Sequence, residues 1–169
     1  LSEEQELLKN SARDFLEKEC PESLVREMED DDKGYSPDLW KKMAEQGWQG
    51  LLIPDTHGGA GFSYLDLIVL IEEFGRALVP GPFISTQVGG VLPLLEGGTD
   101  DQKKQYLPQI ASGKAIWTLA YTEPSARFDT EGVALEVKED GNDVVLNGTK
   151  LFIRDANVAD FFTVVGRKP

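Results

Sequence analysis

The feature of the sequence that most constrains its fold is a change in the spacing of apolar residues at Gly113. Before this glycine, apolar side chains recur every three or four residues, as in amphipathic helices. After it they fall in short β-branched or aromatic segments, as in strands. The 169 residues are enough for two small units. We therefore predict an α+β fold, with an all-α helical domain over residues 1–113 and the beginning of an antiparallel β domain over residues 114–169.

Local start and stop signals divide the first part into helices. Ser36-Pro37 combines an N-cap residue with proline at the first helical position. Ser63 and Thr99 each precede an Asp or a Gln by three residues, which is the spacing of a capping box. We expect helices over residues 1–20, 38–46, 64–78, 83–95 and 99–110.

The second part contains four short segments with the composition of strands. We expect strands over residues 116–121, 133–137, 144–147 continuing into 151–153, and 161–165. The turn signals Asp140-Gly141-Asn142 and Asn147-Gly148 separate them. Because so few strands leave unpaired edges, we expect the β domain to continue beyond residue 169 or to be completed by another chain.

Composition excludes several classes of function. The formal net charge of -13 disfavours binding to nucleic acid or to an anionic membrane surface. Its densest acidic run, from Glu27 to Asp32, is expected on a solvated loop without a metal ion. Cys20 is the single cysteine, which excludes an internal disulfide and fits a reducing cytoplasm. No apolar stretch is long enough to predict a membrane span.

Three stretches carry a resemblance to a known family. They are IPDTHGGAG at 53–61 with EEFGRAL at 72–78, QKKQYLPQIASG at 102–113, and LAYTEP at 119–124 with LNGTKLFI at 146–153. In order and spacing they resemble the acyl-CoA dehydrogenase family, whose subunits have an amino-terminal helical, a middle β and a carboxy-terminal helical domain. The resemblance implies the amino-terminal part of an FAD-dependent enzyme that introduces an α,β double bond into an acyl-CoA thioester.

The resemblance also implies a cofactor site. Its residues here would be Leu119, Tyr121, Thr122, Phe128, Phe152 and Arg154. Strand-end backbone and hydroxyl groups of this kind orient a flavin, while the cofactor performs the redox chemistry. Phe128 and Arg154 depart from the family, which usually has serine and threonine there, and neither replacement is conservative. A second reading therefore stays open: a non-catalytic partner subunit with a degenerate flavin site in a heteromeric dehydrogenase.

Substrate contacts are implied for the helix that would line the acyl chain. We expect Thr86, Gln87 and Gly90 to contact the acyl-CoA, and Gly89-Gly90 to leave volume for bulky groups. The family's catalytic base is a glutamate of the carboxy-terminal domain, so no catalytic residue is expected within these 169 residues, and Glu123 is expected to stabilise a turn. The implied partners are an electron-transfer flavoprotein or similar acceptor and further dehydrogenase subunits, in a homo- or hetero-oligomer.

Overall fold

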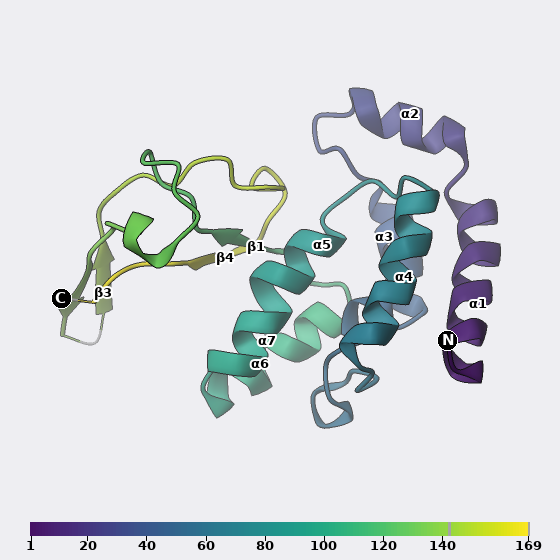
Figure 1. Cartoon of the computed structure of the whole chain (residues 1–169), viewed down its shortest axis with the longest axis horizontal. Helices are drawn as coiled ribbons and strands as arrows, with labels where there is room; N and C mark the ends of the chain where they lie inside the picture. Colours follow the sequence, from purple (N-terminus) through teal and green to yellow (C-terminus); the bar gives the residue numbers. More distant parts are fainter. Residues whose placement is uncertain (142, 169) are drawn as a thin grey trace.

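The computed structural model describes residues 1–141 and 143–168 and has two parts. A helical part contains all the α-helices, and a smaller β part extends from one side of it (Figure 1). The two meet where α5 (Phe83–Thr86) lies beside β1 (Trp117–Ala120), and where the turn η3 (Gln87–Val91) lies beside both β1 and β4 (Phe161–Val164). Helices followed by the start of a small β domain agree with the predicted fold class.

The helical part follows the local signals closely. Its helices are α1 (Glu3–Glu19), α2 (Glu22–Asp30), α3 (Pro37–Glu45), α4 (Tyr64–Arg76), α5 (Phe83–Thr86), α6 (Leu92–Gly97) and α7 (Asp100–Ala111), with short 3-10 turns η1 (Trp48–Gly50) and η2 (Asp55–His57). Ser36, Ser63 and Thr99 are the predicted N-caps, and each side chain accepts a hydrogen bond from the backbone N–H three residues later. The last two complete the predicted capping boxes.

Two helical predictions differ from the structure. Glu27, Glu29 and Asp30 lie in α2 rather than on a loop, although they are exposed as expected. Pro21 ends the first helix and serves as the N-cap of α2. Proline is tolerated at the start of a helix because the N–H group that it lacks would have no partner within the helix there. The single helix expected over 83–95 is interrupted by a π-helical turn, η3 (Gln87–Val91).

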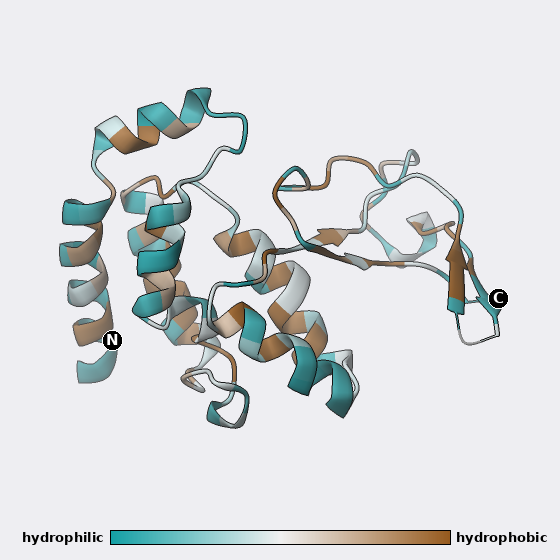
Figure 2. Ribbon diagram, turned by 180° about the vertical axis from the view of Figure 1, so that it is seen from behind, coloured by the Kyte–Doolittle hydropathy of each residue, from teal (hydrophilic) through white to brown (hydrophobic). Residues whose placement is uncertain are grey.

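The core of the helical part lies between α1, α3, α4 and α7. Fully buried side chains from all four include Leu16, Met43, Leu70 and Leu107. Figure 2 shows hydrophobic and hydrophilic residues alternating along these helices, which is the pattern of elements with one buried face. Glu73 of α4, 1% exposed, joins α4 to α1 through the Arg13 guanidinium at 2.7 Å.

The β part contains two separate pairs of strands. β1 (Trp117–Ala120) pairs in parallel with β4 (Phe161–Val164), and β2 (Val137–Asp140) pairs antiparallel with β3 (Asp143–Leu146). The short turn η4 (Thr130–Gly132) precedes β2. The antiparallel prediction therefore holds for the hairpin but not for β1 and β4, whose long connection permits a parallel crossover.

Two predicted strands are shifted or missing. The segment 133–137 forms a strand only from Val137, because the N–H groups of Ala134 and Leu135 bind the Glu123 carboxylate instead of a neighbouring strand. Residues 151–153 are not extended, since Phe152 has a φ of 53°, in the left-handed region. The predicted Asp140-Gly141-Asn142 turn includes Asn142, which lies outside the described residues.

None of the helices in the described part of the chain combines the length and the apolar character needed to cross a membrane.

Candidate functional site

A cleft of about 380 Å³ lies where α5 and η3 meet the end of β1. We call it the strand-end cleft. Its lining residues are Ile84, Ser85, Val88, Gly89, Thr118, Leu119, Tyr121, Thr122, Phe128, Phe152 and Arg154. All six residues implied for flavin binding belong to this set, although they come from three separate segments. The structure thus brings them together, while their binding of a cofactor stays a prediction.

The helical wall of the strand-end cleft presents a different face from the one expected. Thr86 is fully buried and its Oγ1 accepts a hydrogen bond from the Trp117 N–H at 3.2 Å. Gln87 is 1% exposed and donates to the Gln49 carbonyl at 3.0 Å. With Gly90 against Trp117, the three predicted substrate residues face the core rather than the cleft.

Ile84, Ser85 and Val88 line the cleft in their place. Ile84 and Val88 are four residues apart and are 41% and 46% exposed, so they form one open apolar stripe of the helix. The spacing was visible in the sequence, but which face is turned outward depends on where β1 packs. These are the residues that sequence reasoning missed.

The pair Gly89-Gly90 leaves no volume for a substrate, contrary to expectation. A Cβ atom on Gly89 would lie 2.4 Å from the Thr118 carbonyl carbon, and one on Gly90 would lie 2.7 Å from the Trp117 Cβ. The two glycines instead let η3 approach the backbone of β1. Thr163 of β4 adds a hydrogen bond to the Gly89 carbonyl, so this contact joins the helical and β parts.

A buried ion pair holds the end of the segment after β1. The Lys150 ammonium lies 2.7 Å from Glu123 and also donates to the Tyr121 carbonyl at 3.0 Å. The Lys150 hydrogen bond, followed by the N–H groups of Leu135 and Ala134, lowers the pKa of the Glu123 carboxyl to about 2. Glu123 is therefore ionised at neutral pH and its oxygens are engaged. This agrees with the expected role of Glu123 in stabilising a turn.

The opposite wall of the cleft is held in a strained conformation. Phe152 and Asp155 both have a φ of 53°, which is costly for residues with a side chain. Three hydrogen bonds hold the segment from Leu151 to Asp155. The Leu151 N–H donates to the Thr122 carbonyl at 2.8 Å, Thr118 Oγ1 donates to the Arg154 carbonyl at 2.7 Å, and Ser85 donates to Asp155. The Arg154 backbone is therefore fixed at the rim.

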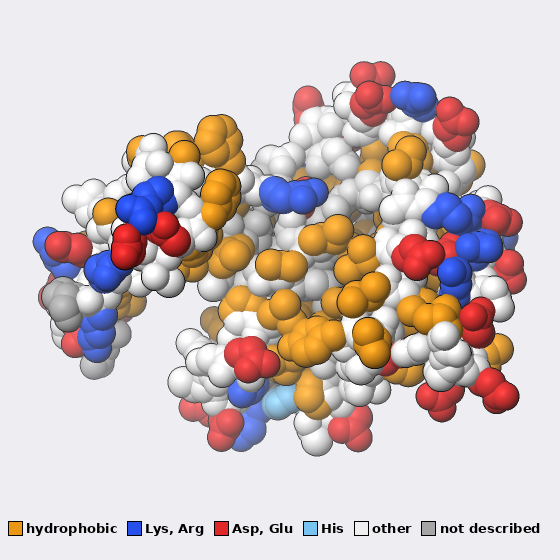
Figure 3. Space-filling view, in the orientation of Figure 1, with side chains coloured by type: hydrophobic (Ala, Val, Ile, Leu, Met, Phe, Trp, Pro, Cys, Tyr) orange, Lys and Arg blue, Asp and Glu red, His pale blue; other side chains and the backbone are white. Residues whose placement is uncertain are grey.

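Exposed apolar side chains surround the strand-end cleft. Phe128 is 82% and Phe152 is 85% exposed. Figure 3 shows further hydrophobic side chains gathered over the helices beside the β part. Leu65 and Ile68 of α4 are also exposed. A protein surface that stays exposed to solvent rarely carries so many apolar side chains.

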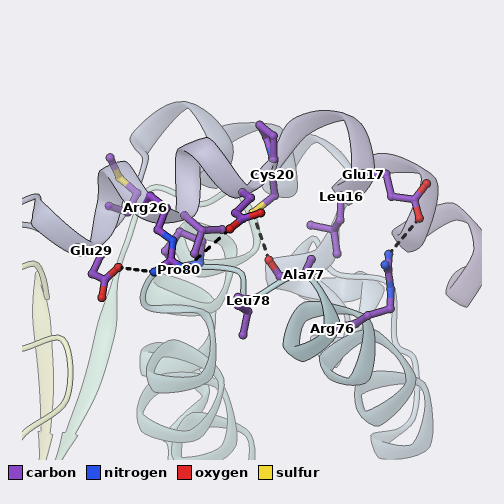
Figure 4. Close-up of a pocket in the computed structure, with 14 residues that line it drawn as sticks. Leu16, Glu17, Cys20, Arg26, Glu29, Arg76, Ala77, Leu78 and Pro80 are labelled. Carbon is purple, nitrogen blue, oxygen red and sulfur yellow. Dashed lines mark hydrogen bonds and ion pairs between the residues drawn. The ribbon is translucent and has the colours of Figure 1, made fainter.

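A larger hollow of about 790 Å³ lies at the other end of the helical part, between α1, α2 and the loop after α4 (Figure 4). Its floor includes Cys20, whose Sγ lies 3.9 Å from the Ala77 carbonyl oxygen. Its arginines are already paired: Arg26 with Glu29 at 3.2 Å and Arg76 with Glu17 at 3.5 Å. The hollow contains none of the six predicted cofactor residues.

Comparison with known families agrees with this arrangement. The sequence model described as "Acyl-CoA dehydrogenase, N-terminal domain" matches residues 2–114, and "Acyl-CoA dehydrogenase, middle domain" matches residues 118–169. Together they cover nearly the whole chain in the order expected. The chain belongs to the acyl-CoA dehydrogenase family.

Individual relatives cover the chain almost from end to end. The mitochondrial long-chain specific acyl-CoA dehydrogenase of Rattus norvegicus is 35% identical over 167 residues, 97% of this chain and 38% of the relative. The Caffeyl-CoA reductase-Etf complex subunit CarC of Acetobacterium woodii is 34% identical over 163 residues, 94% of this chain and 42% of the relative. The crystal structure of the ChsE4-ChsE5 complex from Mycobacterium tuberculosis superposes with a TM-score of 0.83 at 30% identity, covering 99% of this chain and 43% of that one. The chain thus spans about two-fifths of the length of these relatives.

Proposed function

We propose that the complete protein is an acyl-CoA dehydrogenase that uses FAD to introduce an α,β double bond into an acyl-CoA thioester, and that residues 1–169 supply one side of its active site. The observation that carries this proposal is the strand-end cleft, where the six residues implied for flavin face the apolar side chains of Ile84 and Val88. An apolar channel beside a rigid strand end is suited to hold a hydrocarbon chain against a flat cofactor.

The residues of the cleft fit a flavin in two respects. Leu119, Tyr121 and Thr122 lie at or just after the end of β1, where Glu123 and Lys150 fix the backbone. Phe128 and Phe152 expose most of their ring surface, and a flat ring system stacked there would bury it. When bound, FAD supplies the electron-acceptor chemistry of the dehydrogenation.

The described residues bind and orient rather than transfer protons. Of the residues that line the cleft, none is a carboxylic acid or a histidine, and Glu123 is held as a carboxylate by Lys150. We therefore place the base that removes the α proton outside residues 1–169. On this proposal, Ile84 and Val88 exclude water from the acyl chain, and the Thr122 hydroxyl hydrogen-bonds the flavin.

The test compares the complete protein with residues 1–169 alone. Both are assayed for reduction of a dye acceptor with a panel of straight, branched and aryl acyl-CoA thioesters. We expect turnover by the complete protein and none by residues 1–169, because rate depends on a positioned base. Turnover by residues 1–169 would contradict the assignment of the base. A flavin-loaded complete protein that oxidises no thioester of the panel would contradict the proposed activity.

A second candidate is a partner subunit with a degenerate flavin site, which completes the site of another dehydrogenase subunit without catalysing the reaction itself. The observation that favours it is that Phe128 and Arg154 both line the cleft where the family has small hydroxyl residues. Overpacking of a site costs about 1–3 kcal/mol, which weakens binding roughly tenfold to a hundredfold. If this candidate is correct, the subunit carries less than one FAD per chain, and Phe128→Ser with Arg154→Thr raises the molar ratio of FAD to protein, measured by absorbance. A molar ratio near one in the unmodified subunit excludes this candidate.

The proposed function also defines partners and a compartment. We propose an electron-transfer flavoprotein as acceptor and assembly with like or unlike dehydrogenase subunits, supported by the Etf-complex and ChsE4-ChsE5 relatives described above. The exposed apolar surface beside the cleft supports such assembly. The free, buried thiol of Cys20 is compatible with the reducing cytoplasm.

A further inference from the structure

Arg154 differs from every other arginine of the chain. The sequence contains six arginines against an excess of acidic residues. Five of them bind carboxylates or carbonyls: Arg13 to Glu73, Arg26 to Glu29, Arg76 to Glu73, Arg127 to Asp129, and Arg167 to the carbonyls of Val133 and Thr130. Within residues 1–141 and 143–168, the Arg154 guanidinium has no such partner, although its backbone carbonyl is bound by Thr118.

Arg154 is also the single charged residue among the described residues that line the strand-end cleft. The rest of the described lining is uncharged and mostly apolar, and it includes Ile84, Val88 and Leu119. A charge beside low-dielectric walls attracts an opposite charge more strongly than the same charge in open water does. An anion that enters this cleft therefore meets one group prepared to bind it.

The position of Arg154 is maintained at a cost in backbone strain. It lies between the left-handed residues Phe152 and Asp155, and hydrogen bonds from Thr118 and Ser85 hold the segment in place. Strain of this kind persists where the surrounding structure enforces it, and it clusters at ligand sites. The side chain thus starts from a fixed point at the rim of the cleft.

From these contacts we infer that Arg154 binds a carboxylate at the far end of the acyl group, so that the cleft selects acyl-CoA thioesters of dicarboxylic acids. A guanidinium is a planar fork that matches a carboxylate with two parallel hydrogen bonds. The apolar stripe of Ile84 and Val88 matches the methylene groups between the two ends of such a chain. A phosphate carries a second charge, whereas the described lining offers a single cation. The inference rests on the proposed function, since it names the substrate class of the same cleft. It assigns the Arg154 side chain to the substrate and leaves the other five predicted residues to the flavin.

The test uses binding to the complete protein, with any subunit that copurifies, so that it does not depend on turnover. The ligands are S-(4-carboxybutyl)-CoA and its neutral amide S-(4-carbamoylbutyl)-CoA, thioethers that cannot be dehydrogenated. Hydrogen bonds to a charged partner predict that the unmodified protein binds the carboxylate about ten- to a hundredfold more tightly than the amide in calorimetric titration. Arg154→Gln is expected to abolish this preference, measured as the ratio of the two affinities, and Arg154→Lys to retain part of it.

The matched control is Arg127→Gln, which makes the same change of charge on a side chain already paired with Asp129 and Glu131. It is expected to keep the full preference for the carboxylate. Equal binding of the two ligands by the unmodified protein would overturn the inference alone, as would an Arg154→Gln variant that weakens both ligands equally. Failure of both thioethers to bind would overturn the proposed function as well. Flavin content is measured on the same samples by absorbance, and a preference that disappears only where flavin is lost would assign Arg154 to the cofactor and overturn the inference.

Discussion

The helical and β parts of this chain differ in how much of their apolar surface is covered. The helical part has a continuous core from α1 to α7, with side chains such as Leu70 completely buried. In the β part, all four residues of β3 are exposed, including Val144, Val145 and Leu146. The helical part is therefore held by its own packing. The hairpin of β2 and β3 depends on strand pairing that leaves its apolar side chains open to solvent. The comparison teaches that the helical part supports itself, whereas the hairpin lacks a covering layer within the described residues.

The largest expected effect tests this contrast directly. Leu70→Ala removes a fully buried side chain of α4 and should cost about 2–5 kcal/mol of unfolding free energy. Val145→Ala, at a position 46% exposed, should change it by less than about 0.5 kcal/mol. Urea denaturation of both variants, followed by tryptophan fluorescence, measures the difference. Similar costs would show that the hairpin is buried in solution.

A second prediction concerns the contact between the two parts. Gly89→Ala would place a Cβ atom 2.4 Å from the Thr118 carbonyl carbon, so we expect a loss of about 1–3 kcal/mol. Gly75→Ala is the matched control, since its Cβ would meet nothing within 4 Å, and it should stabilise α4 by about 0.4–1 kcal/mol. Thermal unfolding of both variants decides this. A neutral Gly89→Ala would mean that η3 and β1 separate easily.

A third prediction uses one buried carboxylate from each part. The hydrogen bond from Arg13, with that from Arg76, lowers the pKa of Glu73 to about 2, and the Lys150 contact does the same for Glu123. Because both pKa values are lowered on folding, the stabilisation is complete above the unfolded value near 4.5 and is lost as pH falls toward 2.

Urea midpoints measured between pH 6 and pH 2.5 should therefore decline for the unmodified chain. Glu73→Gln and Glu123→Gln should each be less stable at pH 6 and show a shallower decline. A decline of unchanged steepness in either variant would assign the acid sensitivity to other carboxyl groups. Comparing the two variants shows which part of the molecule is destabilised first as the pH falls.

The smallest expected effect concerns the local signals that start the helices. Ser63→Ala removes the N-cap of α4 and should cost about 1 kcal/mol. The loss should appear in the urea midpoint without a change in the slope, because the denatured state is unaffected. Ser63→Asp retains a capping oxygen and should recover most of the stability. Equal stability of the alanine and aspartate variants would mean that packing alone positions this helix.

Particular elements show how far the sequence was predictive. The helices that begin at Pro37, Tyr64 and Asp100 were located from their caps, because a cap and its partner lie within one turn of each other. Four of the six predicted cofactor residues lie in the quoted motifs at 119–124 and 146–153, and Phe128 and Arg154 come from positions that depart from the family pattern. All six line one cleft.

The sequence by itself therefore determined where the capped helices begin, the family, and six of the residues that gather at the cleft. Only the tertiary structure decided that β1 and β4 run parallel, and that Ile84 and Val88 rather than Thr86 and Gln87 face the cleft. It also decided that Glu123 takes the N–H groups of Ala134 and Leu135 out of the expected strand. The physical reason is the same in each case: the deciding contact joins residues well separated along the chain, which no local pattern encodes.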